Sequence, residues 1–194
     1  MKKILSSLLL LASTISALAQ DYKQEITKDY LQYTEYIVTN QPIKAVKYLH
    51  DGLFKFIPKE HIIKGMESIY ESDEMTFVFE DPEILDFSSV KKIDGMYYVI
   101  FQTTSNFQMK MKEITDEKDP QKKAMKISTI QIGFEEKFGR DHVNYSNETG
   151  FFRITSIKKT IANSKDQKDW KFTVIENTQQ KKILEQFIPK ELLD

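Results

Sequence analysis

His50 and Asp51 are adjacent side chains whose types could perform general acid–base catalysis, and Tyr48 lies two residues before them. Neighbouring side chains on a helix point in different directions, so a polar pair at a helix end is the competing interpretation. The sequence contains no nucleophile-elbow, phosphate-binding-loop or dinucleotide-binding pattern that would add a nucleophile or a cofactor. The sequence therefore does not identify catalytic residues, and His50 and Asp51 are the candidates. We predict no cofactor.

The sequence contains no clear metal-binding motif. The three histidines, His50, His61 and His142, do not have the spacing of four that places two ligands on one helix face, and cysteine is absent. Asp116, Glu117 and Asp119 could offer oxygen ligands to a cation, but the glycine and the regular ligand spacing of a calcium loop are missing. We predict that the chain has no metal site.

Tyrosines form the most suggestive group of side chains for ligand binding. A tyrosine ring is buried readily while its hydroxyl requires a polar partner, so several converging tyrosines could line an apolar pocket with polar tips. Ordinary core packing is the alternative, and we favour it. The tyrosines that could line such a pocket are Tyr30, Tyr33, Tyr48, Tyr70 and Tyr98.

The first nineteen residues have the three parts of a secretory signal peptide. Lys2 and Lys3 form a basic start, an apolar run follows, and Ala17-Leu18-Ala19 is a small-x-small cleavage site before Gln20. The run is shorter than the roughly 20 apolar residues that span a bilayer. We expect cleavage between Ala19 and Gln20, and an exported protein, periplasmic or extracellular, without a membrane span.

Composition excludes one class of partner. Without Lys2 and Lys3 the 28 basic residues become 26, which against 29 acidic residues gives a net charge of −3. Nucleic-acid binding requires a concentrated positive field, so we predict no nucleic-acid partner. Residues 20–194 have the length and the apolar content of one domain with its own core.

The elements that must position these side chains follow from periodicity. Apolar residues spaced by three and four predict a helix over 21–38, and shorter helices are expected after Gln41-Pro42 and at Pro58. From Met75 the period changes to two, and Asp94-Gly95 indicates a tight hairpin. The charged segment 112–126 is typical of a solvated surface loop. Residues 127–138 fit a strand or a helix, and the helix is favoured; a helix should also end the chain.

This order of elements predicts an α+β fold, with N-terminal helices packed on a curved antiparallel sheet and a C-terminal helix. It resembles the nuclear-transport-factor-2-like cone, the fold of ketosteroid isomerases, over roughly residues 21–175. That resemblance implies a sheet wrapped around a long first helix, with a cavity at its open end. The segments that carry it are Asp51-Gly52-Leu53-Phe54, Pro58-Lys59-Glu60-His61-Ile62-Ile63-Lys64-Gly65 and Asp169-Trp170-Lys171-Phe172.

The signal junction and the ending Phe187-Ile188-Pro189-Lys190-Glu191 are also similar to small exported proteins of Bacteroidetes-type bacteria. We therefore expect a non-catalytic exported module that binds a small apolar ligand or an envelope partner. The alternative is a cone-fold enzyme of the isomerase or hydrolase type, which would use an acid–base residue in a tyrosine-lined cavity.

Overall fold

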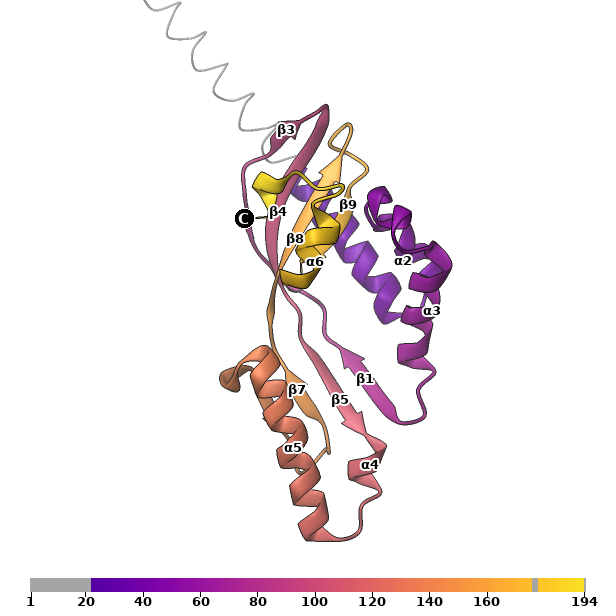
Figure 1. Cartoon of the computed structure of the whole chain (residues 1–194), viewed down its shortest axis with the longest axis vertical. Helices are drawn as coiled ribbons and strands as arrows, with labels where there is room; N and C mark the ends of the chain where they lie inside the picture. The colour runs from indigo at the N-terminus through magenta and orange to yellow at the C-terminus, as the bar shows by residue number, and fades with distance from the viewer. Residues whose placement is uncertain (1–21, 176–177, 194) are drawn as a thin grey trace, which may run out of the picture.

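The computed structural model of the chain describes residues 22–175 and 178–193 (Figure 1). The expected signal peptide, with its cleavage site between Ala19 and Gln20, lies outside the described residues and stays a prediction. Within the described ranges, no helix combines the length and the apolar character needed to cross a membrane.

The N-terminal part of the chain is helical, as the periodicity predicts. A helix covers residues 22–38 and buries its apolar stripe, which includes Tyr22, Ile26, Tyr30 and Tyr33. Pro42 then starts the next helix at a position where a missing N–H costs nothing. The elements that follow are α2 (Pro42–Ala45), 3-10 helices over Val46–Tyr48 and Asp51–Lys55, and α3 (Lys59–Tyr70).

The strands form two antiparallel sheets. Sheet A has the strand order β2-β4-β8-β9, with β3 also paired to β4, and sheet B has the order β1-β5-β7-β6. The strands of sheet A are β2 (Ile84–Phe87), β3 (Lys91–Ile93), β4 (Met96–Thr104), β8 (Ile157–Ser164) and β9 (Lys171–Ile175). Those of sheet B are β1 (Met75–Phe79), β5 (Phe107–Met111), β6 (Val143–Tyr145) and β7 (Phe152–Ile154).

Both faces of sheet A are covered, which explains why β4 is apolar on both sides. The helix over 22–38 packs on one face, where Val99, Phe101 and Phe172 belong to the same core cluster as Tyr30. On the other face, Tyr98 and Ile161 pack against the C-terminal segment. That segment consists of α6 (Thr178–Leu184) and a 3-10 helix over Lys190–Leu192.

Sheet B has its own core under a long helix, α5 (Pro120–Phe138), which runs beside it (Figure 1). The α5 side chains Ile127, Ile130 and Phe134 pack against the buried residues Phe152 and Ile154 of β7. A short helix, α4 (Lys112–Thr115), connects β5 to this part of the chain.

The two sheets meet at a waist, where the chain passes from β4 to β5 at residues 105–106 and from β7 to β8 at residues 155–156 (Figure 1). Hydrogen bonds hold these crossings together. The Ser105 N–H donates to the Ser156 carbonyl at 2.8 Å, and the Ser156 hydroxyl donates to the Ser105 carbonyl at 3.0 Å. The two crossings are therefore joined to each other at the waist.

The predicted α+β class is confirmed, with N-terminal helices packed on antiparallel strands and a helix near the C-terminus. The hairpin is confirmed as well, since Asp94 and Gly95 both have positive φ, 49° and 81°. The helical interpretation of 127–138 is also correct, and Gly139 follows that helix with φ 94°.

The prediction of a loop over 112–126 is wrong. The segment is mostly exposed, as expected, but it contains α4 and the first turns of α5. The physical reason is local: the Asp119 carboxylate accepts hydrogen bonds from the Gln121 and Lys122 N–H groups, at 2.9 and 3.2 Å. Pro120 occupies the first helical position, so Asp119-Pro120 is a helix start rather than a loop.

Candidate functional site

Two adjoining hollows lie at the waist, on either side of Phe79, Ser105 and Lys158, which line both of them. The first, which we name the helix-side hollow, has a volume of about 320 Å³. Its wall is mostly apolar and comes from the C-terminal half of the helix over 22–38, the end of β1 and the start of β8. Besides the three shared residues, its lining includes Tyr30, Tyr33, Thr34, Ile37, Val38, Glu80, Pro82, Thr104 and Val174.

The second hollow, named here the α5-side hollow, has a volume of about 720 Å³ and a more polar lining. It lies where the C-terminal end of α5 approaches the crossing between β7 and β8. Phe79, Phe107 and Phe138 form its aromatic part, with ring centroids 6.2 Å apart for Phe79–Phe107 and 6.1 Å for Phe107–Phe138. Lys137 and His142 add polar groups to its wall.

The basic and acidic side chains at the two hollows differ in whether they form ion pairs. The ammonium groups of Lys137 and Lys158 lie over the Phe138 ring, 5.1 and 6.0 Å from its centroid, which is a cation–π arrangement. The acidic residue Glu80, by contrast, accepts a hydrogen bond from the Arg153 guanidinium at 3.2 Å. The local charge available to a ligand is therefore positive.

A third, smaller hollow of about 260 Å³ lies between β9 and the C-terminal segment and shares Tyr33 and Val174 with the helix-side hollow. We name it the tail-side hollow. Its wall is mostly apolar, and Leu49, Leu53 and Leu184 contribute to it. The end of β9 thus separates this hollow from the helix-side hollow.

Three of the five predicted ligand-binding tyrosines lie together. Tyr30, Tyr33 and Tyr48 surround Phe172 of β9, with ring centroids 5.2, 5.9 and 6.4 Å from it. The Tyr30 hydroxyl forms a buried hydrogen bond with the Thr103 hydroxyl at 3.2 Å, and burial raises the pKa of Tyr30. Tyr30 and Tyr33 line the helix-side hollow, whereas Tyr48 lines neither hollow at the waist.

The other two tyrosines lie elsewhere. Tyr70, on α3, donates its hydroxyl hydrogen to the Ile37 carbonyl at 2.6 Å, and its ring is 6.1 Å from Phe79, so it supports the wall from outside. Tyr98 is on the opposite face of β4 and packs with Ile161 and the C-terminal segment. The structure therefore does not bring Tyr98 to the other tyrosines.

His50 and Asp51 are adjacent in the sequence but lie in different environments. The His50 ring is buried, and its Nδ1 accepts a hydrogen bond from the Gly52 N–H at 2.9 Å. Burial lowers the pKa of His50, although the nearby Asp51 carboxylate opposes the shift. Asp51 itself is exposed. His50 thus caps the 3-10 helix over Asp51–Lys55, and the two side chains do not face a common hollow.

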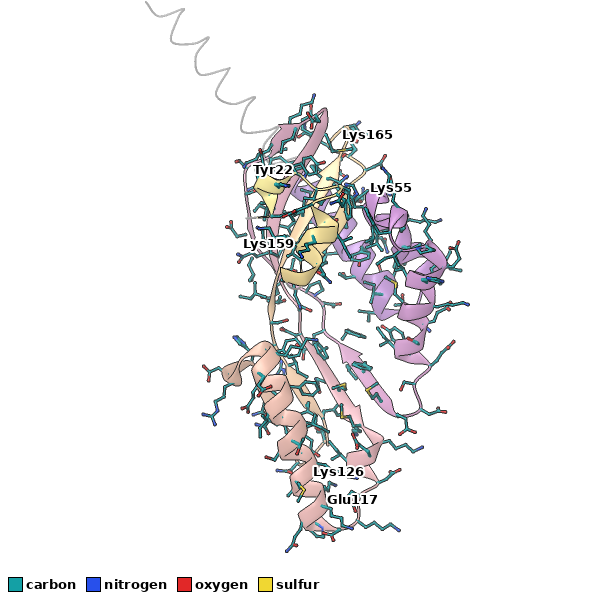
Figure 2. The ribbon with its side chains drawn as sticks, viewed as in Figure 1. Tyr22, Lys55, Glu117, Lys126, Lys159 and Lys165 are labelled. Atoms are coloured by element: carbon teal, nitrogen blue, oxygen red, sulfur yellow. The ribbon has the colours of Figure 1, made fainter. Side chains whose placement is uncertain are left out.

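The acidic residues considered for a cation have other roles. Glu117 forms an ion pair with Lys126 at 3.0 Å, at the end of the molecule where α5 begins (Figure 2). Asp119 caps α5. Over residues 22–175 and 178–193, no group of three or more His, Asp or Glu side chains is arranged to hold a metal ion.

The sequence pattern did not indicate Phe79, Lys137, Phe138 and Lys158 as site residues. They come from β1, α5 and β8, and it is the pairing of distant strands that brings these elements to one place. A local signal existed only for Phe138, the last apolar residue of the predicted helix. No short-range spacing connects it to Phe79 or Lys158.

Comparisons of the chain with models of protein families, with curated proteins and with solved structures found no match. The resemblance to the nuclear-transport-factor-2-like cone stays a prediction for this reason.

Proposed function

We propose that the protein is an exported, non-catalytic binding module whose ligand is a small molecule with an apolar body, held at the waist. The observation that carries the proposal is the pair of adjoining hollows that share Phe79, Ser105 and Lys158. Their volumes, about 320 and 720 Å³, fall in the range of roughly 300–1,000 Å³ that small-molecule sites occupy.

The composition of the walls supports an apolar ligand. Ile37, Val38 and Val174 give the helix-side hollow a surface that an aliphatic or ring system would cover favourably, at roughly 25 cal/mol for each Å² removed from water. Part of each wall belongs to a core cluster, with Tyr30 and Tyr33 in one and Phe138 in another, and the serine pair joins the two crossings at the waist. A pre-formed site loses little conformational entropy on binding.

Thermal melting of the protein from residue 20 onward, with a set of fatty acids, sterols and aromatic metabolites, tests the proposal. A ligand at 100 times its dissociation constant should raise the melting temperature by roughly 5–10 °C. Thr34→Phe, which adds a ring at the wall of the helix-side hollow, should abolish the shift. Leu31→Phe, at an exposed position on the same helix, is the matched control and should preserve it. If no compound shifts the wild-type protein, the proposal is wrong.

Export is a separate part of the proposal and needs its own measurement. The mass of the protein recovered from the producing bacterium should correspond to a chain that begins at Gln20, and the protein should fractionate outside the cytoplasm. Substitution of Ala19 by Arg should leave the precursor uncleaved, because cleavage sites require a small residue there. An uncleaved wild-type chain in the cytoplasm would contradict this part.

A further inference from the structure

We infer that the ligand is an amphiphilic anion, with its anionic group bound between the ammonium groups of Lys137 and Lys158 and its apolar body in the helix-side hollow. The inference rests on the proposed function and adds the chemical class of the ligand to it.

The ammonium groups of the two lysines lie near the same aromatic ring. Since their Nζ atoms lie 5.1 and 6.0 Å from the same ring centroid, they are separated by at most the sum of those distances, about 11 Å. Neither ammonium forms an ion pair with a carboxylate of the residues that the structure describes. Two nearby like charges repel each other, and an anion between them would remove that repulsion.

The surroundings of the lysines also favour an anion. Lys158 is half-buried, so its charge is screened less than that of an exposed side chain. The one carboxylate that lines either hollow among the described residues is Glu80, and the Arg153 guanidinium neutralises it. His142, whose Nδ1 lies 3.2 Å from the Thr155 hydroxyl, is the remaining titratable group in the wall besides the lysines and the tyrosines. An anionic head group would thus meet positive charge without an opposing unpaired acid.

Polarity changes from one hollow to the other. Lys158 lines both hollows, the α5-side hollow contains the second lysine, and the helix-side hollow is mostly apolar. A molecule with a charged end and an apolar end matches this order. A ligand that is uncharged throughout would leave both ammonium groups without a counter-charge.

Isothermal titration with decanoate, decyl phosphate and decan-1-ol tests the inference. Each of the three probes has ten carbon atoms in one unbranched chain, so they differ only in the group at the end of that chain. We expect at least one anionic probe to bind about tenfold or more tighter than the alcohol. Its affinity should fall with increasing salt, whereas that of decan-1-ol should not. The comparison of decanoate with decyl phosphate then identifies the head group.

Substitutions assign the effect to the two lysines. Lys158→Met and Lys137→Met keep an unbranched side chain of similar length and remove the charge. Each should weaken the anionic probe about fivefold and so reduce its preference over decan-1-ol. Lys158→Arg retains the charge and should retain the preference for the anion. Lys165→Met, in the loop after β8 and far from the waist (Figure 2), is the control and should change nothing.

The outcomes separate the two proposals. If the alcohol and the anions bind with equal affinity and neither lysine variant alters it, the inference about the head group is wrong and the proposed function stands. If none of the three probes binds the folded wild-type protein, the inference is wrong, and the proposed function then depends on the wider set of compounds. Circular dichroism of each variant confirms that lost binding is not lost folding.

Discussion

Phe187 occupies the space that a side chain on Gly52 would require. A Cβ placed on Gly52 would lie 2.5 Å from the Phe187 Cβ, far closer than two such carbons can approach. The Phe187 ring also lies 4.9 Å from the His50 ring and 6.0 Å from the Phe56 ring, measured between centroids. Gly52 is therefore the place where the C-terminal segment docks on the N-terminal part of the chain.

Gly52→Ala should lower the free energy of unfolding by about 1–3 kcal/mol, since the added methyl group forces Phe187 and its neighbours to move. Urea denaturation measures the change. Gly65→Ala is the matched control: Gly65 is inside α3 with no heavy atom within 4 Å of the added carbon. That substitution should raise the free energy of unfolding by roughly 0.5–1 kcal/mol, because alanine loses less backbone entropy in a helix. Equal effects of the two substitutions would contradict the role assigned to Phe187.

The hydrogen bond between Tyr30 and Thr103 should be measurable as a coupling. Both hydroxyls are buried, so Tyr30→Phe leaves Thr103 without this partner and should cost about 1–2 kcal/mol of stability. Thr103→Val should cost a similar amount. The double variant should lose less than the sum of the two, because the second substitution removes a group that is already unpaired. Strictly additive losses would show that the bond contributes nothing.

Stability should decrease as the pH falls from about 7 to 5, through the effect of His50. Burial holds the pKa of folded His50 below its ordinary value of 6.5, so the unfolded chain takes up a proton first. The slope of unfolding free energy with pH is positive wherever the unfolded state binds more protons. Protonation of Nδ1 would also remove the acceptor for the Gly52 N–H.

His50→Asn isolates this contribution, since asparagine can still accept the capping hydrogen bond but does not titrate. Urea denaturation at several pH values should give a smaller slope for this variant than for wild type. His61→Gln, an exposed position at the start of α3, should leave the slope as it is. Burial also raises the pKa of Asp29, so this carboxyl gives a slope of unfolding free energy with pH of the opposite sign. That contribution falls at pH values around and above 3.8, the ordinary pKa of the group. A wild-type slope that persists in His50→Asn would contradict the prediction.

Local patterns predicted the elements of this fold well, because helix stripes and the Asp94-Gly95 turn depend on neighbouring residues. They predicted the site poorly. Residue type alone groups Tyr98 with the other tyrosines, yet Tyr98 alternates in β4 with Val99, which faces the helix over 22–38. That alternation was visible in the sequence. The sequence does not show that Phe79 and Lys158 line the same hollow, because this follows from strand pairings that no local rule specifies.

The start of α5 lies in the charged segment and depends on the Asp119 cap. Asp119→Ala removes the carboxylate that accepts hydrogen bonds from two backbone N–H groups, so it should lower the free energy of unfolding by about 1 kcal/mol. Asp119→Asn should retain most of the stability, because the amide oxygen still accepts. Asp116→Ala, three residues earlier and exposed, is the control and should change stability by less than about 0.5 kcal/mol. Urea denaturation followed by circular dichroism measures all three. If Asp119→Ala and Asp116→Ala behave alike, the cap does not stabilise α5, and the helical start of this charged segment requires another cause.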